Sequence, residues 1–157
     1  MASGARLFGH PIHPPLTHFP VALWSISLVW DILALWLGEA IFWHISFWSI
    51  AAGLLFALPA SITGLIEFMN VPVERKAAQQ TATWHMMAVM LAASVYAASL
   101  FLRGSVIIPP PEMMFLILAV SLFGFLALQV GGWLGGHLVY HHRIGLNKSE
   151  DSDETPE

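Results

Sequence analysis

The residues best suited to chemistry in this sequence are its histidines, most of which lie near the ends of apolar runs. The chain contains eight histidines and no cysteine. Thiol catalysis and iron–sulfur ligation by this chain are therefore excluded, whereas neutral imidazole binds transition metals and haem iron. Three of the histidines, His10, His13 and His18, occur just before or at the start of the first long apolar run.

Prolines restrict the conformation of this opening segment, residues 10–20. A proline biases the residue before it away from the α region, so His10 and His13 are predicted to precede any regular helix. Thr17 is a good N-cap residue, and its position predicts that the first helix starts there with His18 in its first turn.

The composition indicates a protein embedded in lipid. Hydrophobic residues make up 57% of the 157 residues, charged residues only 10%, and the mean hydropathy is +0.69. Soluble domains contain about 25% charged residues. Four apolar runs, each long enough to cross a hydrocarbon core of ~30 Å, occupy residues 17–37, 41–68, 82–102 and 113–135.

These runs predict an all-α integral membrane protein. Short connections force successive spans to run in opposite directions, so residues 1–146 are expected to form an antiparallel four-helix transmembrane bundle. Residues 147–157 are acidic and nearly free of apolar side chains, and this tail is predicted to be disordered.

The basic residues predict the orientation in the membrane. With four spans, both termini and the loop 70–81 lie on one side, which carries five of the six Lys and Arg residues. These five are Arg6, Arg75, Lys76, Arg143 and Lys148. The positive-inside rule then places both termini in the cytoplasm. Charges balance before the tail, which excludes a basic nucleic-acid surface.

Seven of the eight histidines fall on the side of the termini, and only His44 lies on the other. His141 and His142 follow the last span and are interpreted as surface residues. Each of the four spans also contributes one polar group to a common layer on that side, namely His18, Glu67, His85 and Gln129. Polar groups are rare in membrane bundles without a task, so their convergence predicts a site.

Three hypotheses describe this site. The leading one is b-type haem for membrane electron transfer, with His18 and His85 as axial ligands facing each other across the bundle. His13 is the reserve ligand, and Gln129 would fix an imidazole tautomer by a hydrogen bond. The second is a divalent transition-metal ion, structural or transport-related, with ligands drawn from His10, His13, His18, Glu67 and His85.

The third hypothesis is a cofactor-free subunit of a membrane complex, whose histidines lie at the membrane interface. Hydrolysis is not predicted, because no serine, cysteine or paired carboxylate is arranged with a base. At most, the protein is then a redox component.

Asp31 is predicted to lie outside the histidine site, because it is about 20 Å deeper in the membrane than His18 and roughly 140° round the helix. A carboxylate within a span should face the bundle and be neutral or paired, and Arg103 and Ser49 are candidate partners.

Glycines are expected to provide the closest helix contacts. The last span contains two overlapping GxxxG patterns, Gly131 with Gly135 and Gly132 with Gly136. Small residues at this spacing let helices approach closely, and contacts within the bundle are favoured over a dimer face. A homo-oligomer stays an open alternative.

Short motifs spread over the chain read Gly9-His10-Pro11-Ile12-His13-Pro14, His18-Phe19-Pro20, Thr63-Gly64-Leu65-Ile66-Glu67 and Gly132-Trp133-Leu134-Gly135-Gly136-His137. With Asp31 and His85, they resemble the bacterial predicted membrane proteins called domain of unknown function 2231. Glu67 stands where that family often has Asp, and His137 and Arg143 stand where it commonly has other residues. The resemblance implies a four-span protein of a bacterial inner membrane without an established activity. Some members are joined to, or encoded with, Rieske-type iron–sulfur proteins, so a Rieske-type or other redox protein is the partner it implies.

Overall fold

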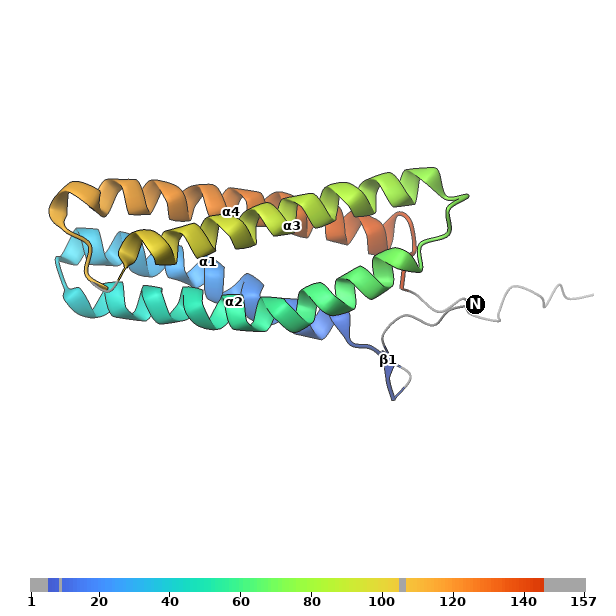
Figure 1. Cartoon of the computed structure of the whole chain (residues 1–157), viewed down its shortest axis with the longest axis horizontal. Coiled ribbons are helices and arrows are strands. Elements are labelled where there is room, and N and C mark those ends of the chain that lie inside the picture. Colours follow the sequence, from blue (N-terminus) through green and yellow to red (C-terminus); the bar gives the residue numbers. More distant parts are fainter. Residues whose placement is uncertain (1–5, 9, 105–106, 146–157) are drawn as a thin grey trace, which may run out of the picture.

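The computed structural model describes residues 6–8, 10–104 and 107–145, and most of them lie in four helices. A ladder of two short antiparallel strands, β1 (Arg6–Leu7) and β2 (His10–Pro11), precedes them. The helices are α1 (His13–Leu37), α2 (Ala40–Met69), α3 (Lys76–Arg103) and α4 (Pro111–Tyr140). The chain passes along the long axis of the molecule four times (Figure 1). The predicted all-α four-helix class is confirmed, whereas the predicted tail, residues 147–157, lies outside the described residues.

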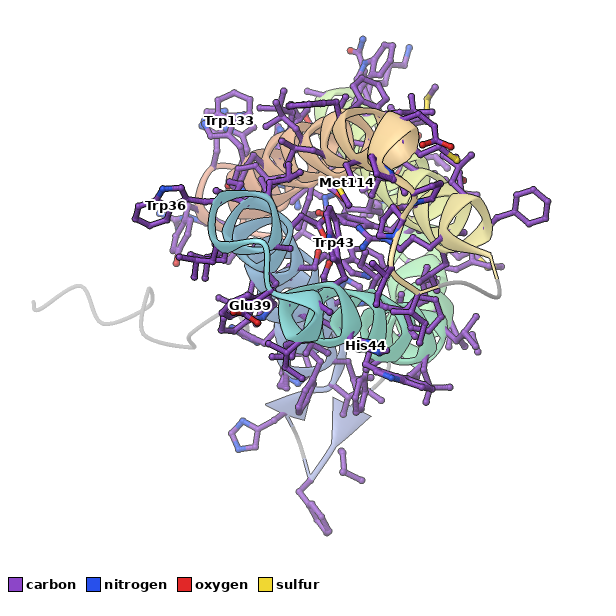
Figure 2. The ribbon with its side chains drawn as sticks, turned by 90° about the vertical axis from the view of Figure 1, so that its left-hand side faces the viewer. Trp36, Glu39, Trp43, His44, Met114 and Trp133 are labelled. Carbon is purple, nitrogen blue, oxygen red and sulfur yellow. The ribbon has the colours of Figure 1, made fainter. Side chains whose placement is uncertain are left out.

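Each helix is long and apolar enough to cross a membrane. Figure 2 looks along the bundle and shows Trp36 and Trp133 projecting outward, while Trp43 points into the interior. The exposed fractions agree, at 78% for Trp36 and 70% for Trp133 against 2% for Trp43. Such outward apolar side chains require lipid as their solvent, and the protein therefore contacts the bilayer.

The start of α1 differs from the prediction. The helix begins at His13, not at Thr17, and Pro14 and Pro15 lie in its first turn. The first amides of a helix have no acceptor within it, so proline costs little there. Thr17 does not cap the helix, since its hydroxyl donates to the carbonyl of Pro14 over 2.8 Å.

The four helices form two hairpins, because α1 packs chiefly against α2 and α3 chiefly against α4. We term them the first and second hairpins. Their boundary is filled in the middle by Trp24 and Tyr96, whose rings stack with centroids 4.9 Å apart. The Tyr96 hydroxyl also donates to the carbonyl of Trp24 over 3.1 Å. An aromatic pair and a hydrogen bond therefore join the hairpins at the centre of the bundle.

The two ends of the bundle differ in what they contain. One end, termed the turn end, holds the α1–α2 and α3–α4 connections (Figure 1). The other, termed the histidine end, holds the starts of α1 and α3 and the ends of α2 and α4. Seven of the eight histidines belong to the histidine end, and the candidate site is built there.

Candidate metal site at the histidine end

Three histidines at the end of α4 form a cluster, here termed the outer triad: His137, His141 and His142. One ring nitrogen from each lies within 4.8 Å of those of the other two. Residues four apart share a helix face, which explains why His137 and His141 stack with centroids 4.4 Å apart. His142 is fixed from α3, because its Nε2 lies 3.1 Å from the Thr81 hydroxyl. The guanidinium of Arg75 also donates to the carbonyl of His142.

The surroundings of His142 favour its neutral form. Partial desolvation, and then the charges of His141, His137 and Arg75, lower the pKa of the His142 imidazole from its ordinary value. A neutral imidazole keeps a lone pair for a metal ion.

Two further histidines, here termed the inner pair, lie deeper: His13 on α1 and His85 on α3. The Nδ1 atom of His13 lies 2.9 Å from the carbonyl oxygen of Ala60 and 3.1 Å from the Thr63 hydroxyl. The Nδ1 atom of His85 lies 2.8 Å from the carbonyl oxygen of Gly131. A carbonyl only accepts, so Nδ1–H donates in both rings and a neutral ring carries its lone pair on Nε2.

Glycines on the neighbouring helices make room for both rings. A Cβ atom on Gly64 would come 2.7 Å from Cε1 of His13, and one on Gly135 would come 3.1 Å from Cε1 of His85. Both distances are shorter than ordinary van der Waals contact. Each imidazole therefore lies close against a stretch of backbone, in a space that a larger residue than glycine would fill. His13 and His85 each lie eleven residues, about three helical turns, before Trp24 and Tyr96, whose rings stack, so the two imidazoles lie in one layer of the bundle.

The glycine patterns of α4 divide between two faces. Gly131 approaches Val89 of α3, where a Cβ atom would meet Cγ1 at 2.7 Å, and Gly135 approaches His85. The predicted contact within the bundle is thus confirmed for this pattern. Among the described residues, a Cβ atom on Gly132 would meet nothing within 4 Å, and one on Gly136 would meet only Tyr140 of the same helix, so the second pattern lies on the outer face.

The predicted pairing of His18 with His85 is wrong. The side chain of His18 is exposed, and so is that of Gln129, which was expected beside it. The cause is the start of α1. Because His13 is already helical and faces α2, His18 lies five residues on and about 140° round the helix, which turns it outward.

The other predicted ligands occupy separate places. His10 is exposed in β2, and Glu67 is half-buried near the end of α2. Of the predicted ligand set, His13 and His85 are the two whose rings are held between helices by hydrogen bonds to backbone carbonyls. The outer triad was missed, because α4 continues five residues beyond the predicted end at residue 135. A helix extending to Tyr140 sets His137 and His141 one turn apart. Their spacing of four residues in the sequence could have predicted this cluster.

A second polar centre lies at the turn end. Asp31 Oδ2 is 2.7 Å from Nη2 of Arg103, and both side chains are fully buried. Ser121 donates to the same carboxylate oxygen over 2.7 Å. The predicted pairing of Asp31 with Arg103 is confirmed, whereas Ser49 donates instead to a carbonyl of its own helix.

Arg103 is enclosed on its other sides as well. Its guanidinium lies 5.6 Å from the ring centroid of Trp43, at a distance typical of a cation–π contact. Its Nε donates to Ser99 over 3.4 Å. The charges of this centre are thus satisfied mainly by each other, with Asp31 Oδ1 and Arg103 Nη1 left without a partner among the described residues.

The fold defines an integral membrane protein with four apolar helices, an ion pair buried between them and histidines at one end. Residues 9–148 match the model of the family described as predicted membrane protein DUF2231, and the chain belongs to this family. No curated protein and no solved structure matches it.

Proposed function

We propose that this membrane protein binds a divalent transition-metal ion through His137, His141 and His142. The observation that carries the proposal is the mutual distance of their ring nitrogens, at most 4.8 Å. Two ligands of one metal ion, each bonded over ~2 Å, lie up to ~4 Å apart. Small rotations of the three rings would therefore bring them onto a shared ion.

The ligand set indicates which ions fit. Imidazole suits zinc, copper, iron and nickel, whereas calcium and magnesium prefer oxygen ligands. Three protein ligands leave at least one coordination position open, which is the arrangement of sites that exchange or act on a further ligand. The half-buried and exposed positions of the triad give an ion access from the aqueous side. These features support metal capture at the membrane surface, in a structural or transport-related role.

A competition titration of the detergent-purified protein with Zn²⁺ tests the proposal. His141→Ala removes one ligand and is expected to weaken zinc binding about tenfold or more. His18→Ala is the matched control, since His18 is an exposed histidine near the same end outside the triad. Equal zinc affinities in the wild type and the His141 variant would refute a site at the triad.

A second candidate is b-type haem, with the inner pair as axial ligands and electron transfer as its role. The Nδ1 hydrogen bonds of His13 and His85 favour it, because they direct the lone pairs to Nε2. Haem supplies four nitrogen ligands of its own, so two imidazoles suffice. Against it, the imidazoles already fill the recesses at Gly64 and Gly135, so these recesses offer no space for the macrocycle.

The visible spectrum decides between these candidates. A Soret band with sharp bands on reduction, lost in His85→Ala and kept in His18→Ala, would establish haem at the inner pair. A Rieske-type redox partner would become worth testing only after that result. A colourless protein with bound zinc would leave the triad as the metal site.

We also propose that the histidine end faces the cytoplasm, in an inner membrane. Arg103 is fully buried in its ion pair and does not count as a loop charge. The five other Lys and Arg residues then all belong to the side of the termini, which strengthens the positive-inside argument. Fluorescent and alkaline phosphatase fusions at Glu157 test the orientation, and phosphatase activity there would reverse it.

A further inference from the structure

Among the described residues, the hydrogen bonds that join α1 to the second hairpin lie in the middle and at the turn end. They are the Tyr96 hydroxyl on the carbonyl of Trp24, and Arg103 and Ser121 on Asp31. At the histidine end the imidazoles bond differently. His13 bonds to α2, within the first hairpin, and His85 bonds to α4, within the second hairpin. Each ring of the inner pair is therefore fixed to its own hairpin.

The boundary between the hairpins separates the two rings. They lie in one layer, at the same depth before the stacked Trp24 and Tyr96, and in each ring Nδ1 makes the hydrogen bond to a carbonyl. A group that accepts two imidazole lone pairs from opposite sides would add, at the histidine end, the link that Asp31 and Arg103 provide at the turn end.

We propose that His13 and His85 bind one transition-metal centre between the hairpins, each through Nε2, and that this centre holds the histidine end closed. The site is separate from the outer triad, and it rests on the ligand pair of the second candidate function. Two sources share this chemistry, namely a free divalent ion with water as further ligands, and the iron of a haem. In both cases the ligand binds the two hairpins together and so stabilises the closed bundle.

Binding is tested in a background that lacks the outer triad, His137→Ala/His141→Ala/His142→Ala, in which any remaining metal site is elsewhere. One arm adds Co²⁺ and follows its visible absorption, and the other adds hemin and follows the Soret band. His13→Ala and His85→Ala are each expected to weaken binding about tenfold or more in the arm that binds. His18→Ala is expected to leave it unchanged. Loss in only one of the two inner-pair variants, or no binding in either arm, would overturn the shared centre.

A second pair of variants tests the site without removing a ligand. Gly135→Ala places a methyl group 3.1 Å from Cε1 of His85, so the ring must move and binding should weaken. Gly132→Ala makes the same change three residues away in open space and should leave binding unaffected. Equal binding in these two variants would contradict a centre that depends on the position of His85.

Closure is measured by distances between spin labels, which the cysteine-free chain allows at chosen pairs. Ser61→Cys with Thr83→Cys labels exposed sites on α2 and α3 at the histidine end, and Ile41→Cys with Phe101→Cys labels the turn end. On adding the ligand, the distance distribution at the histidine end should narrow and that at the turn end should stay the same. Bound ligand without any change at the histidine end would refute the closure.

Discussion

The two ends of the bundle both contain polar side chains, but they use them in different ways. At the turn end Asp31, Arg103 and Ser121 satisfy one another, and both charged side chains are fully buried. At the histidine end each inner imidazole uses one nitrogen to bond to backbone, and the outer triad is partly exposed. The buried charges at the turn end hold helices together. In the proposed function, the imidazole lone pairs at the histidine end are the groups that bind a ligand.

The largest expected effect concerns the turn end. Arg103→Met leaves Asp31 as an uncompensated buried charge and should lower the free energy of unfolding by about 3–5 kcal/mol. Denaturation of the protein in mild detergent measures it. The double variant Asp31→Leu/Arg103→Met removes both charges and should recover most of the loss. If the double variant is as unstable as Arg103→Met, the uncompensated charge of Asp31 is not the cause of the lost stability.

A smaller effect is expected where the inner pair meets backbone. Gly64→Ala brings a methyl group 2.7 Å from His13 and should cost about 1–3 kcal/mol through overpacking. Gly132→Ala, on the open face of α4, should instead stabilise the helix by up to about 1 kcal/mol. Thermal unfolding of the two variants beside the wild type measures the difference. Opposite signs are the prediction, and a shared sign would contradict the close packing at Gly64.

A pH effect is expected at the outer triad. The pKa of His142 is lowered, so the folded protein holds this proton less tightly than the unfolded chain, and its contribution to stability falls as the pH drops below about 6.5. Arg75→Gln removes one of the nearby positive charges and should raise the pKa of His142 toward its ordinary value. A histidine titration followed by NMR measures the change. Lys76→Gln serves as the control at the neighbouring position. An equal change in the pKa of His142 in this variant would show that Arg75 has no specific effect on it.

The smallest expected effect tests whether the two ends are independent. Asp31→Asn keeps the shape of the side chain at the turn end and should leave zinc affinity at the outer triad unchanged. The same competition titration measures it, beside His141→Ala as the variant that does lose affinity. A change in zinc affinity in Asp31→Asn would mean that the two ends are coupled through the bundle.

The sequence by itself determined the membrane class, the number of helices and one long-range contact. Helical spans follow from composition, because lipid offers no partner for a free backbone amide and every hydrogen bond must be made locally. The pairing of Asp31 with Arg103 followed from the same lack of polar partners in lipid, since a charged side chain inside a span has few groups with which it can pair.

Only the tertiary structure decided which histidines meet. A helix advances about 100° per residue, so placing the start of α1 at Thr17 instead of His13 selected His18 and not His13 as the inward ring. The end of α4 was also predicted wrongly, and the wrong end hid a histidine contact. Hydropathy marks where the lipid ends and not where the helix ends. The helix continues to Tyr140 and so brings His137 and His141 together beyond the apolar run. Hydrophobic patterning fixes which segments are buried, whereas the phase and end of each helix depend on local bonds and packing that composition does not encode.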